Sequence, residues 1–185
     1  MKEPAAQLPI LTFHAIDDRQ SAISFSPLLF ERALQRLRAR GFRSLDLCDA
    51  VGMLRRDKPI PPLSLVITFD DGYRSVYTEA LPILARYGMT ATVFLATGEH
   101  PPASVAQRLP ELQGRTMLSW AEAREMQRCG IAFGAHSLTH PDLTRQSEAE
   151  IERQLTRSQE MIRDILATPV SCLAYPFGRY DRATR

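Results

Sequence analysis

The segment LSLVITFDDGY, residues 63–73, decides the fold of this chain. Its apolar run stops at two adjacent carboxylates, Asp70 and Asp71, which Gly72 follows. Because the run is short, β-branched and apolar on both faces, it predicts a buried strand of a parallel sheet. Carboxylates are costly to bury, so two of them at a strand end favour a site that needs negative charge. The same residues would also suit a local turn in which Asp71 caps the next helix.

Further strand-like runs alternate with helical patterns along the chain. The other predicted strands lie at residues 8–14, 42–45, 90–96, 131–135 and 170–175, and the predicted helices begin near Ser26, Leu47, Val76, Ser119 and Ser147. Pro82 predicts a kink or a late start in the third helix. Residues 98–116 are polar and predict a long loop at the rim of a binding site. The β-α alternation predicts one α/β domain with a parallel sheet or barrel.

Polar residues follow several of the predicted strands. His14, the pair Asp70 and Asp71, His136 and Tyr175 each stand at or just beyond a strand's carboxyl end. Parallel strands share one carboxyl face, so we expect these side chains to lie on the same rim.

The segment HSLTH carries two histidines, His136 and His140, directly after a predicted strand. Imidazoles spaced by four residues can hold one metal ion, although the same spacing also occurs in unrelated loop histidines. Two histidines and one aspartate form a set typical of hydrolytic zinc or non-haem iron sites. The sequence therefore predicts metal-assisted hydrolysis, with one aspartate as ligand and the other as the base that activates water. The pattern does not assign the two roles.

The composition is that of an ordinary globular protein. The chain has 185 residues, 44% of them hydrophobic, and its net charge of +2 argues against an electrostatic nucleic-acid surface. Cys48, Cys129 and Cys172 are far apart and predict no disulfide framework, with Cys129 and Cys172 as packing residues. The sequence shows neither a signal-peptide core nor a membrane span, so we expect a cytoplasmic protein.

Three motifs carry a resemblance to a known family. TFDDG at residues 68–72, HSLTH at residues 136–140 and YPFG at residues 175–178 resemble the first three motifs of the polysaccharide deacetylase (NodB-homology) family, carbohydrate esterase family 4. The upstream segment LTFHAID resembles a subgroup with an extra N-terminal strand that ends in a Phe/Tyr-His pair. The resemblance covers nearly the whole chain from Leu8.

This resemblance implies a distorted (β/α) barrel and a divalent metal ion, usually zinc. It implies that Asp71, His136 and His140 hold the metal and that Asp70 is the catalytic base. The reaction would be hydrolysis of the N-acetyl group of an amino sugar in a poly- or oligosaccharide. Tyr175 and the backbone N–H near Phe177 would contact the substrate and stabilise the oxyanion.

The chain also departs from the family pattern. Ala174 stands where many members have an arginine that orients the base. The family's later motifs, including a Leu-x-His whose histidine protonates the leaving amine, are absent, so we expect residues 1–185 to be one truncated domain with an incomplete barrel. His14 is a candidate for supporting the metal site from behind the ligands or for contacting the substrate, and His100 is expected to be a solvated surface residue.

Two other functions remain open at this point. The same site would also suit hydrolysis of a non-sugar amide, since relatives act on other amides. A chain without the later motifs would also suit a metal- and glycan-binding fragment that has no turnover.

Overall fold

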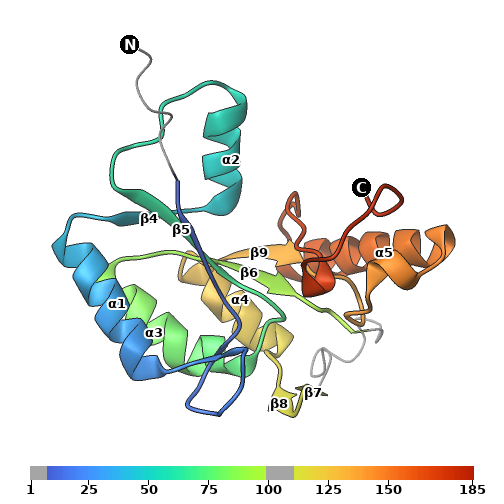
Figure 1. The fold of residues 1–185 in the computed structure, drawn as a ribbon, viewed down its shortest axis with the longest axis horizontal. Helices are drawn as coiled ribbons and strands as arrows, with labels where there is room; N and C mark the ends of the chain where they lie inside the picture. Colours follow the sequence, from blue (N-terminus) through green and yellow to red (C-terminus); the bar gives the residue numbers. More distant parts are fainter. Residues whose placement is uncertain (1–7, 99–110) are drawn as a thin grey trace.

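The computed structural model of the chain describes residues 8–98 and 111–185. Its centre is a parallel sheet with the strand order β1 (Ile10–Phe13), β5 (Ser64–Phe69), β6 (Thr92–Leu95) and β9 (Ala132–Ala135). A fifth strand, β4 (Arg43–Leu45), pairs with the first half of β5 (Figure 1). The predicted α/β architecture with a parallel sheet is confirmed, and the strands of the described residues do not close into a barrel.

Strand β5 is the buried strand that the sequence predicted. All six of its residues are buried, because β1 and β4 pair with it along its length and helices cover the sheet. Its last residue, Phe69, packs against Phe13 at the end of β1 and Phe30, with ring centroids 5.8 Å away in both cases. These rings fix the ends of two neighbouring strands at the point where the polar residues begin.

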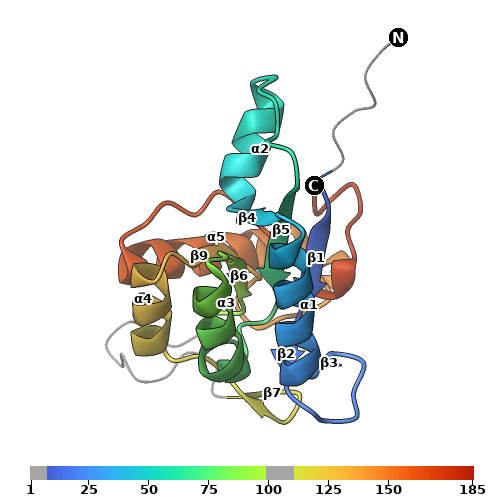
Figure 2. The same cartoon turned by 90° about the vertical axis from the view of Figure 1, so that its left-hand side faces the viewer.

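Five α-helices surround the sheet. They are α1 (Pro27–Ala39), α2 (Leu47–Arg55), α3 (Leu81–Tyr87), α4 (Trp120–Arg128) and α5 (Glu148–Leu166). Helices α1, α3 and α4 lie side by side (Figures 1 and 2), while α5 packs against β9 and α4. Within the described ranges, no helix combines the length and apolar character that crossing a bilayer requires.

The helix starts follow local signals in the sequence. Residues 74 and 75 are already helical, and a π-helical turn, η1 (Val76–Ala80), leads directly into α3 with Pro82 in its first turn, so the predicted late start does not occur and the π-helical turn accommodates the proline. Ser119 and Glu122 form a complete capping box at α4. At α5, Ser147 accepts a hydrogen bond from the backbone N–H of Glu150, but the Glu150 side chain pairs with Arg153.

Two small strand pairs lie at the carboxyl side of the sheet. They are β2 (Ala15–Ile16) with β3 (Ser24–Phe25), and β7 (Glu111–Leu112) with β8 (Arg115–Thr116). Residues 111–116 were predicted as part of a loop and instead form an antiparallel hairpin. The rest of that predicted loop, residues 99–110, lies outside the described residues.

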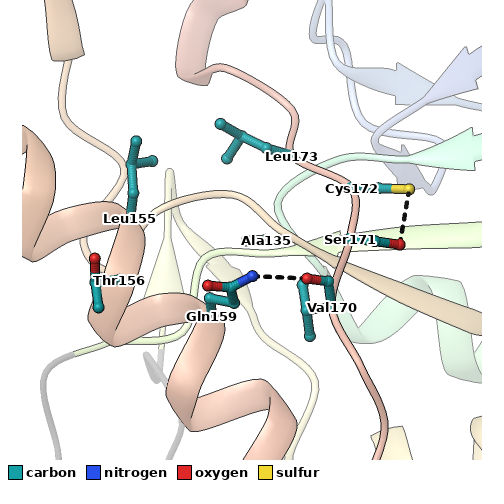
Figure 3. A pocket seen from close by; sticks show the side chains of 8 residues that line it. All are labelled: Ala135, Leu155, Thr156, Gln159, Val170, Ser171, Cys172 and Leu173. Atoms are coloured by element: carbon teal, nitrogen blue, oxygen red, sulfur yellow. Dashed lines mark hydrogen bonds between the residues drawn. The ribbon is translucent and has the colours of Figure 1, made fainter. Parts of the chain in front are cut away.

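Residues 170–175 were predicted as a strand, and this prediction is wrong. The segment makes only one parallel bridge to β9, between Ala135 and Leu173. A longer ladder would need the Ala174 carbonyl to accept the backbone N–H of Ser137, but Ser137 turns away at φ 65° and the carbonyl contacts the His136 ring instead. Beside α5 the segment borders a cavity of about 210 Å³, across which Gln159 donates to the Val170 carbonyl (Figure 3).

The cysteines also differ from their prediction. Cys48, in α2, and Cys172 form a disulfide across 124 residues of sequence, and Cys129 is exposed rather than packed. Nothing local in the sequence signalled this pair, because the two positions meet only through the fold. Disulfides persist mainly in oxidising compartments, so the cytoplasmic location stays a prediction without support from the structure.

Two glycines give a matched test of the packing. A Cβ on Gly134 in β9 would lie 2.6 Å from the Phe94 ring and 3.0 Å from the Cys172 carbonyl oxygen, whereas a Cβ on Gly52 in α2 meets nothing within 4 Å. We expect Gly134→Ala to lower the free energy of unfolding by about 1–3 kcal/mol through overpacking. Gly52→Ala should raise it by about 0.5–1 kcal/mol, because alanine favours a helix interior. Urea denaturation measures both, and equal effects of the same sign would contradict this account.

Candidate active site

The carboxyl ends of β1, β5 and β9 open into one cavity of about 380 Å³. Its lining residues are His14, Ile23, Asp70, Asp71, Gln113, His136, His140, Tyr175, Phe177 and Gly178. The structure therefore brings together all seven residues that the sequence suggested for the site. They come from both ends of the described chain and meet because the parallel strands share one carboxyl face.

The two aspartates face the cavity because the backbone turns sharply between them. The N–H of Asp70 still donates to the Phe13 carbonyl at 2.9 Å, which continues the pairing with β1. Asp71 and Gly72 then adopt left-handed conformations, with φ 68° and 79°. Such a conformation costs a non-glycine residue of the order of 1 kcal/mol, so the turn at Asp71 is maintained by its surroundings.

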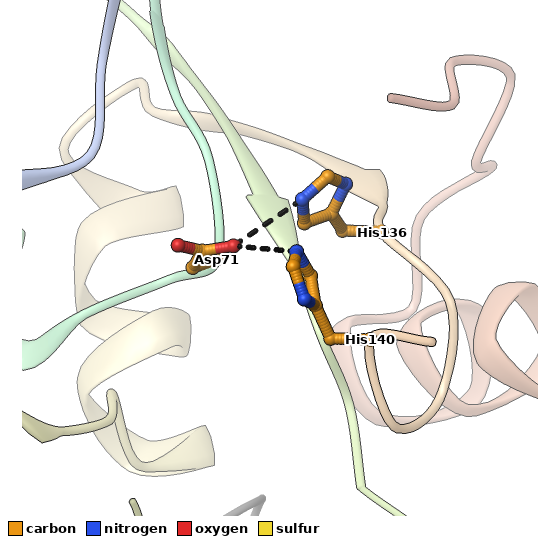
Figure 4. Close-up of side chains that lie close together, drawn as sticks. All are labelled: Asp71, His136 and His140. Carbon is orange, nitrogen blue, oxygen red and sulfur yellow. Dashed lines mark ion pairs between the residues drawn. The ribbon is translucent and has the colours of Figure 1, made fainter. Parts of the chain in front are cut away.

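Asp71, His136 and His140 converge on one point (Figure 4). Oδ1 of Asp71 lies 3.3 Å from Nε2 of His136 and 3.1 Å from Nε2 of His140. One donor atom from each residue lies within 4.8 Å of the others. All three side chains are almost fully buried, so bulk water screens their charges poorly.

The ring of His136 is oriented by its second nitrogen. Nδ1 lies 2.8 Å from the Ala174 carbonyl oxygen, which can only accept, so Nδ1 carries a proton. In a neutral imidazole, Nε2 then presents a lone pair toward the Asp71 carboxylate. Two acceptors 3.3 Å apart require a positive species between them, either a proton or a metal cation.

The loop that carries the histidines is attached to the neighbouring strand β6. Just beyond β6, the N–H groups of Thr97 and Gly98 donate to the carbonyls of Ser137 and Leu138, at 3.2 and 2.7 Å. Ser137 and His140 have φ of 65° and 59°, which makes the loop tight enough to return His140 to the cavity.

Gln154 of α5 supports the same loop from the other side. Its Oε1 accepts the N–H groups of Leu138 and Thr139 at 2.9 and 3.0 Å, and its Nε2 donates to the Thr139 hydroxyl at 3.0 Å. Gln154 is only 1% exposed. Gln154 was not predicted; the usable signal is a glutamine on the buried face of α5, three residues after the buried Ile151.

The two carboxylates are in different electrostatic states. Burial by itself raises the pKa of Asp71, but hydrogen bonding and electrostatic attraction to His136 and His140 outweigh burial, so this pKa lies well below its usual range. Burial raises the pKa of Asp70 above its ordinary value, and the neighbouring Asp71 charge adds to the rise. Asp71 therefore stays ionised, while Asp70 has the stronger affinity for a proton.

His14 faces Asp70 from the end of β1. Its Nε2 lies 3.9 Å from Oδ2 of Asp70, beyond hydrogen-bond distance but close enough for a charge interaction. Ala174 supplies no such partner to Asp70, and His14 is the side chain that approaches the Asp70 carboxylate from β1.

The third motif forms another wall of the cavity. Phe177 has φ 59°, and its ring lies 4.7 Å from that of His140 in an edge-to-face contact. The Tyr175 hydroxyl donates to the Thr184 carbonyl at 3.1 Å. Ile23, Gln113 and Gly178 also line the cavity. Gly178 belongs to the third motif and Gln113 to the predicted rim of residues 98–116, but neither was singled out as a site residue, and Ile23 was missed. His100 lies outside the described residues.

The donor set fits a divalent metal ion. Two imidazole Nε2 atoms and one carboxylate oxygen point to the same place, and the Ala174 carbonyl fixes the tautomer of one imidazole. Such a set with open positions is usual for metal sites that carry out hydrolysis. On the carboxyl face of a parallel sheet, such a donor set has the arrangement expected of a metal site in an α/β protein.

The chain belongs to the polysaccharide deacetylase family, whose sequence profile matches residues 57–185. YxkH of Bacillus subtilis, named as a polysaccharide deacetylase, is 28% identical over 182 residues, or 98% of this chain and 61% of that protein. The poly-beta-1,6-N-acetyl-D-glucosamine N-deacetylase of Staphylococcus aureus is 27% identical over 164 residues, or 84% of this chain and 54% of that protein. The chain thus spans between one half and two thirds of the length of these relatives.

A solved structure supports the same assignment. The Streptococcus pyogenes deacetylase PplD, in complex with acetate, superimposes on this chain with a TM-score of 0.85 at 27% identity. The alignment covers 98% of this chain and 78% of the PplD chain. The fold and the family resemblance predicted from the three motifs are therefore confirmed.

Gln154 provides a test of how the histidine loop is held. Gln154→Leu keeps the bulk but leaves two backbone N–H groups without their acceptor, so we expect zinc affinity to fall about ten-fold, as for other outer-shell changes. Zinc affinity can be measured by competition with a chromogenic chelator. Gln159→Leu, one turn further along α5, loses only the bond to the Val170 carbonyl and should retain the parent affinity. Equal affinities of both variants would contradict the role given to Gln154.

Proposed function

We propose that this protein hydrolyses the N-acetyl group of N-acetylated amino sugars in a poly- or oligosaccharide. The observation that carries the proposal is the meeting of Asp71, His136 and His140 with a second carboxylate, Asp70, in one open cavity. Membership of the polysaccharide deacetylase family supports carbohydrate deacetylation. The S. aureus relative is named for acting on an N-acetylglucosamine polymer, which supports the class of substrate.

In this proposal, Asp71, His136 and His140 hold a divalent cation, with zinc as the expected metal. Such a cation, when bound, polarises the acetyl carbonyl and makes water more acidic. The low pKa of Asp71 keeps its carboxylate ionised as a ligand, and the Ala174 carbonyl keeps Nε2 of His136 available. Burial around the three residues strengthens each of these interactions.

Asp70 is the proposed base. It takes a proton from the attacking water, the water oxygen bonds to the acetyl carbon, and the carbon–nitrogen bond breaks. The proton taken by Asp70 is the one that the leaving nitrogen requires, so the reaction balances as acetic acid and an amine, and a further proton transfer between the two products gives acetate and an ammonium group. His14 lies on the side of Asp70 where its ring can orient the carboxylate or contact the sugar.

Residues of the third motif complete the proposed site. A backbone N–H near Phe177 would donate to the developing oxyanion, and the Tyr175 and Phe177 side chains, which line the cavity, would face the sugar. The acetate in the PplD complex is the acid that N-deacetylation releases, which supports the product class.

Metal binding tests the ligand set. We expect the parent chain and Asp70→Asn to bind one equivalent of zinc, whereas Asp71→Asn and His136→Ala lose it because each removes a donor. Equilibrium dialysis with metal analysis measures the stoichiometry. Retention of one equivalent by both ligand variants would exclude this set.

Activity tests the base. We expect zinc-loaded Asp70→Asn to lose about 10²–10⁴-fold in kcat, because asparagine cannot take the proton. The assay measures acetate released from an N-acetylglucosamine oligomer, with an acetylated peptide as the non-sugar amide. Parent-level turnover by Asp70→Asn would show that another group is the base, and preference for the peptide would show that the substrate class is wrong.

A further inference from the structure

The hairpin formed by β7 and β8 carries a residue of the cavity wall on its turn. The pairs Leu112–Arg115 and Glu111–Thr116 leave Gln113 and Gly114 as a two-residue turn. Both have positive φ, 52° and 71°, as a type I′ turn requires. Asn-Gly is the usual sequence for such a turn, and a glutamine at its first position is conformationally unfavourable. An unfavourable residue that lines a site is a reason to look for a function.

Two arginines hold this turn by its carbonyl groups. Arg115 donates from Nη1 to the Gln113 carbonyl at 3.4 Å, and Arg19 donates from Nη1 to the Gly114 carbonyl at 2.7 Å. The Gln113 backbone is therefore bound at the turn itself as well as through the short hairpin ladder.

Arg115 also links the hairpin to the segment that contains β2 and β3. Its guanidinium donates to Oδ2 of Asp17 at 2.9 Å and to the Ser24 hydroxyl at 2.6 Å, and the residue is only 7% exposed. A buried arginine is tolerated when its donors are satisfied in this way. Figure 2 shows β7 beside β2 and β3, and Ile23, which precedes β3, lines the same cavity.

Gln113 offers chemistry that suits a sugar. Its amide has both donor and acceptor atoms, which match sugar hydroxyls and the acetamido group. It carries no charge, so it does not disturb the balance between Asp71 and the histidines. Because the backbone that carries this side chain is already held, little backbone freedom is lost when a ligand binds, which favours affinity.

We propose that Gln113 is a substrate-binding residue, whose amide hydrogen-bonds a hydroxyl or acetamido group of the sugar ring, and that the Asp17–Arg115 ion pair positions its turn. This inference rests on the proposed function, because it names a specificity-determining contact of the same site. The loss of one such hydrogen bond corresponds to a change of roughly three- to ten-fold in affinity.

A glycine at position 113 relieves the backbone strain of the positive φ, so a loss of binding can be told apart from a loss of stability. Gln113→Gly removes the side chain and favours the positive φ, so we expect a higher Tm together with roughly three- to ten-fold weaker binding of a β-1,6-linked N-acetylglucosamine oligomer. Isothermal titration calorimetry on the zinc-loaded chain gives Kd, and thermal unfolding gives Tm. Ala167→Gly is the matched control, since Ala167 has φ 51° at the end of α5 and does not line the cavity. It should raise Tm and leave Kd unchanged.

The outcomes distinguish the role of Gln113 from the proposed function. An unchanged Kd of Gln113→Gly, with the parent binding the oligomer, overturns the role of Gln113 and leaves the proposed function intact. A weakened Kd without turnover by the parent overturns the proposed function and supports Gln113 as a glycan contact. A parent chain that binds no oligomer overturns both. In the variant Asp17→Asn, which keeps Gln113, a parent-like Kd would overturn the positioning role of the ion pair.

Discussion

A carboxylate buried at the end of an apolar strand is the constraint on which the site depends. Asp71 is only 2% exposed, and it follows a strand whose residues are all buried. A buried negative charge is stable only beside positive charge and hydrogen-bond donors. Since β5 itself supplies neither, the compensation comes from His136 and His140, more than 60 residues away in sequence. The sheet has to bring the end of β9 close to that of β5 for the chain to tolerate Asp71.

Strand β6 makes that approach possible, because it lies between the other two. At the end of β6, hydrogen bonds reach the segments that follow both neighbouring strands. On the β5 side the Ala96 N–H donates to the Asp71 carbonyl, and on the β9 side the Leu95 carbonyl accepts the His136 N–H. Thr97 and Gly98 then bond the histidine loop. The carboxylate and imidazoles are thus attached to one backbone segment. The separation between the ligand atoms of Asp71, His136 and His140 is consequently set by the spacing of the parallel strands and by a histidine loop that is bonded to β6.

The sequence predicted what depends on local pattern. The buried β5 and the shared rim follow from apolar runs, turn residues and the geometry of parallel sheets. Residues 170–175 were wrongly assigned to a strand, because their apolar pattern does not reveal that the Ala174 carbonyl bonds His136. The Cys48–Cys172 pair, Gln113 and Gln154 were missed for a related reason. Their contacts join segments far apart in sequence, and a local pattern carries no information on such contacts.

The conformational strain of the described chain is concentrated at this site. Of the eight non-glycine residues with positive φ, five belong to the cavity wall or the histidine loop: Asp71, Gln113, Ser137, His140 and Phe177. Each costs folding free energy, so the packing of β6, the support from Gln154 and the arginine bonds at the hairpin turn must offset that cost. Groups held in this way need little rearrangement when charge develops on a substrate. The stability lost at these positions is therefore the physical source of the site's preorganisation. The contacts that offset this loss come from helix α5 and the hairpin rather than from within the three motifs.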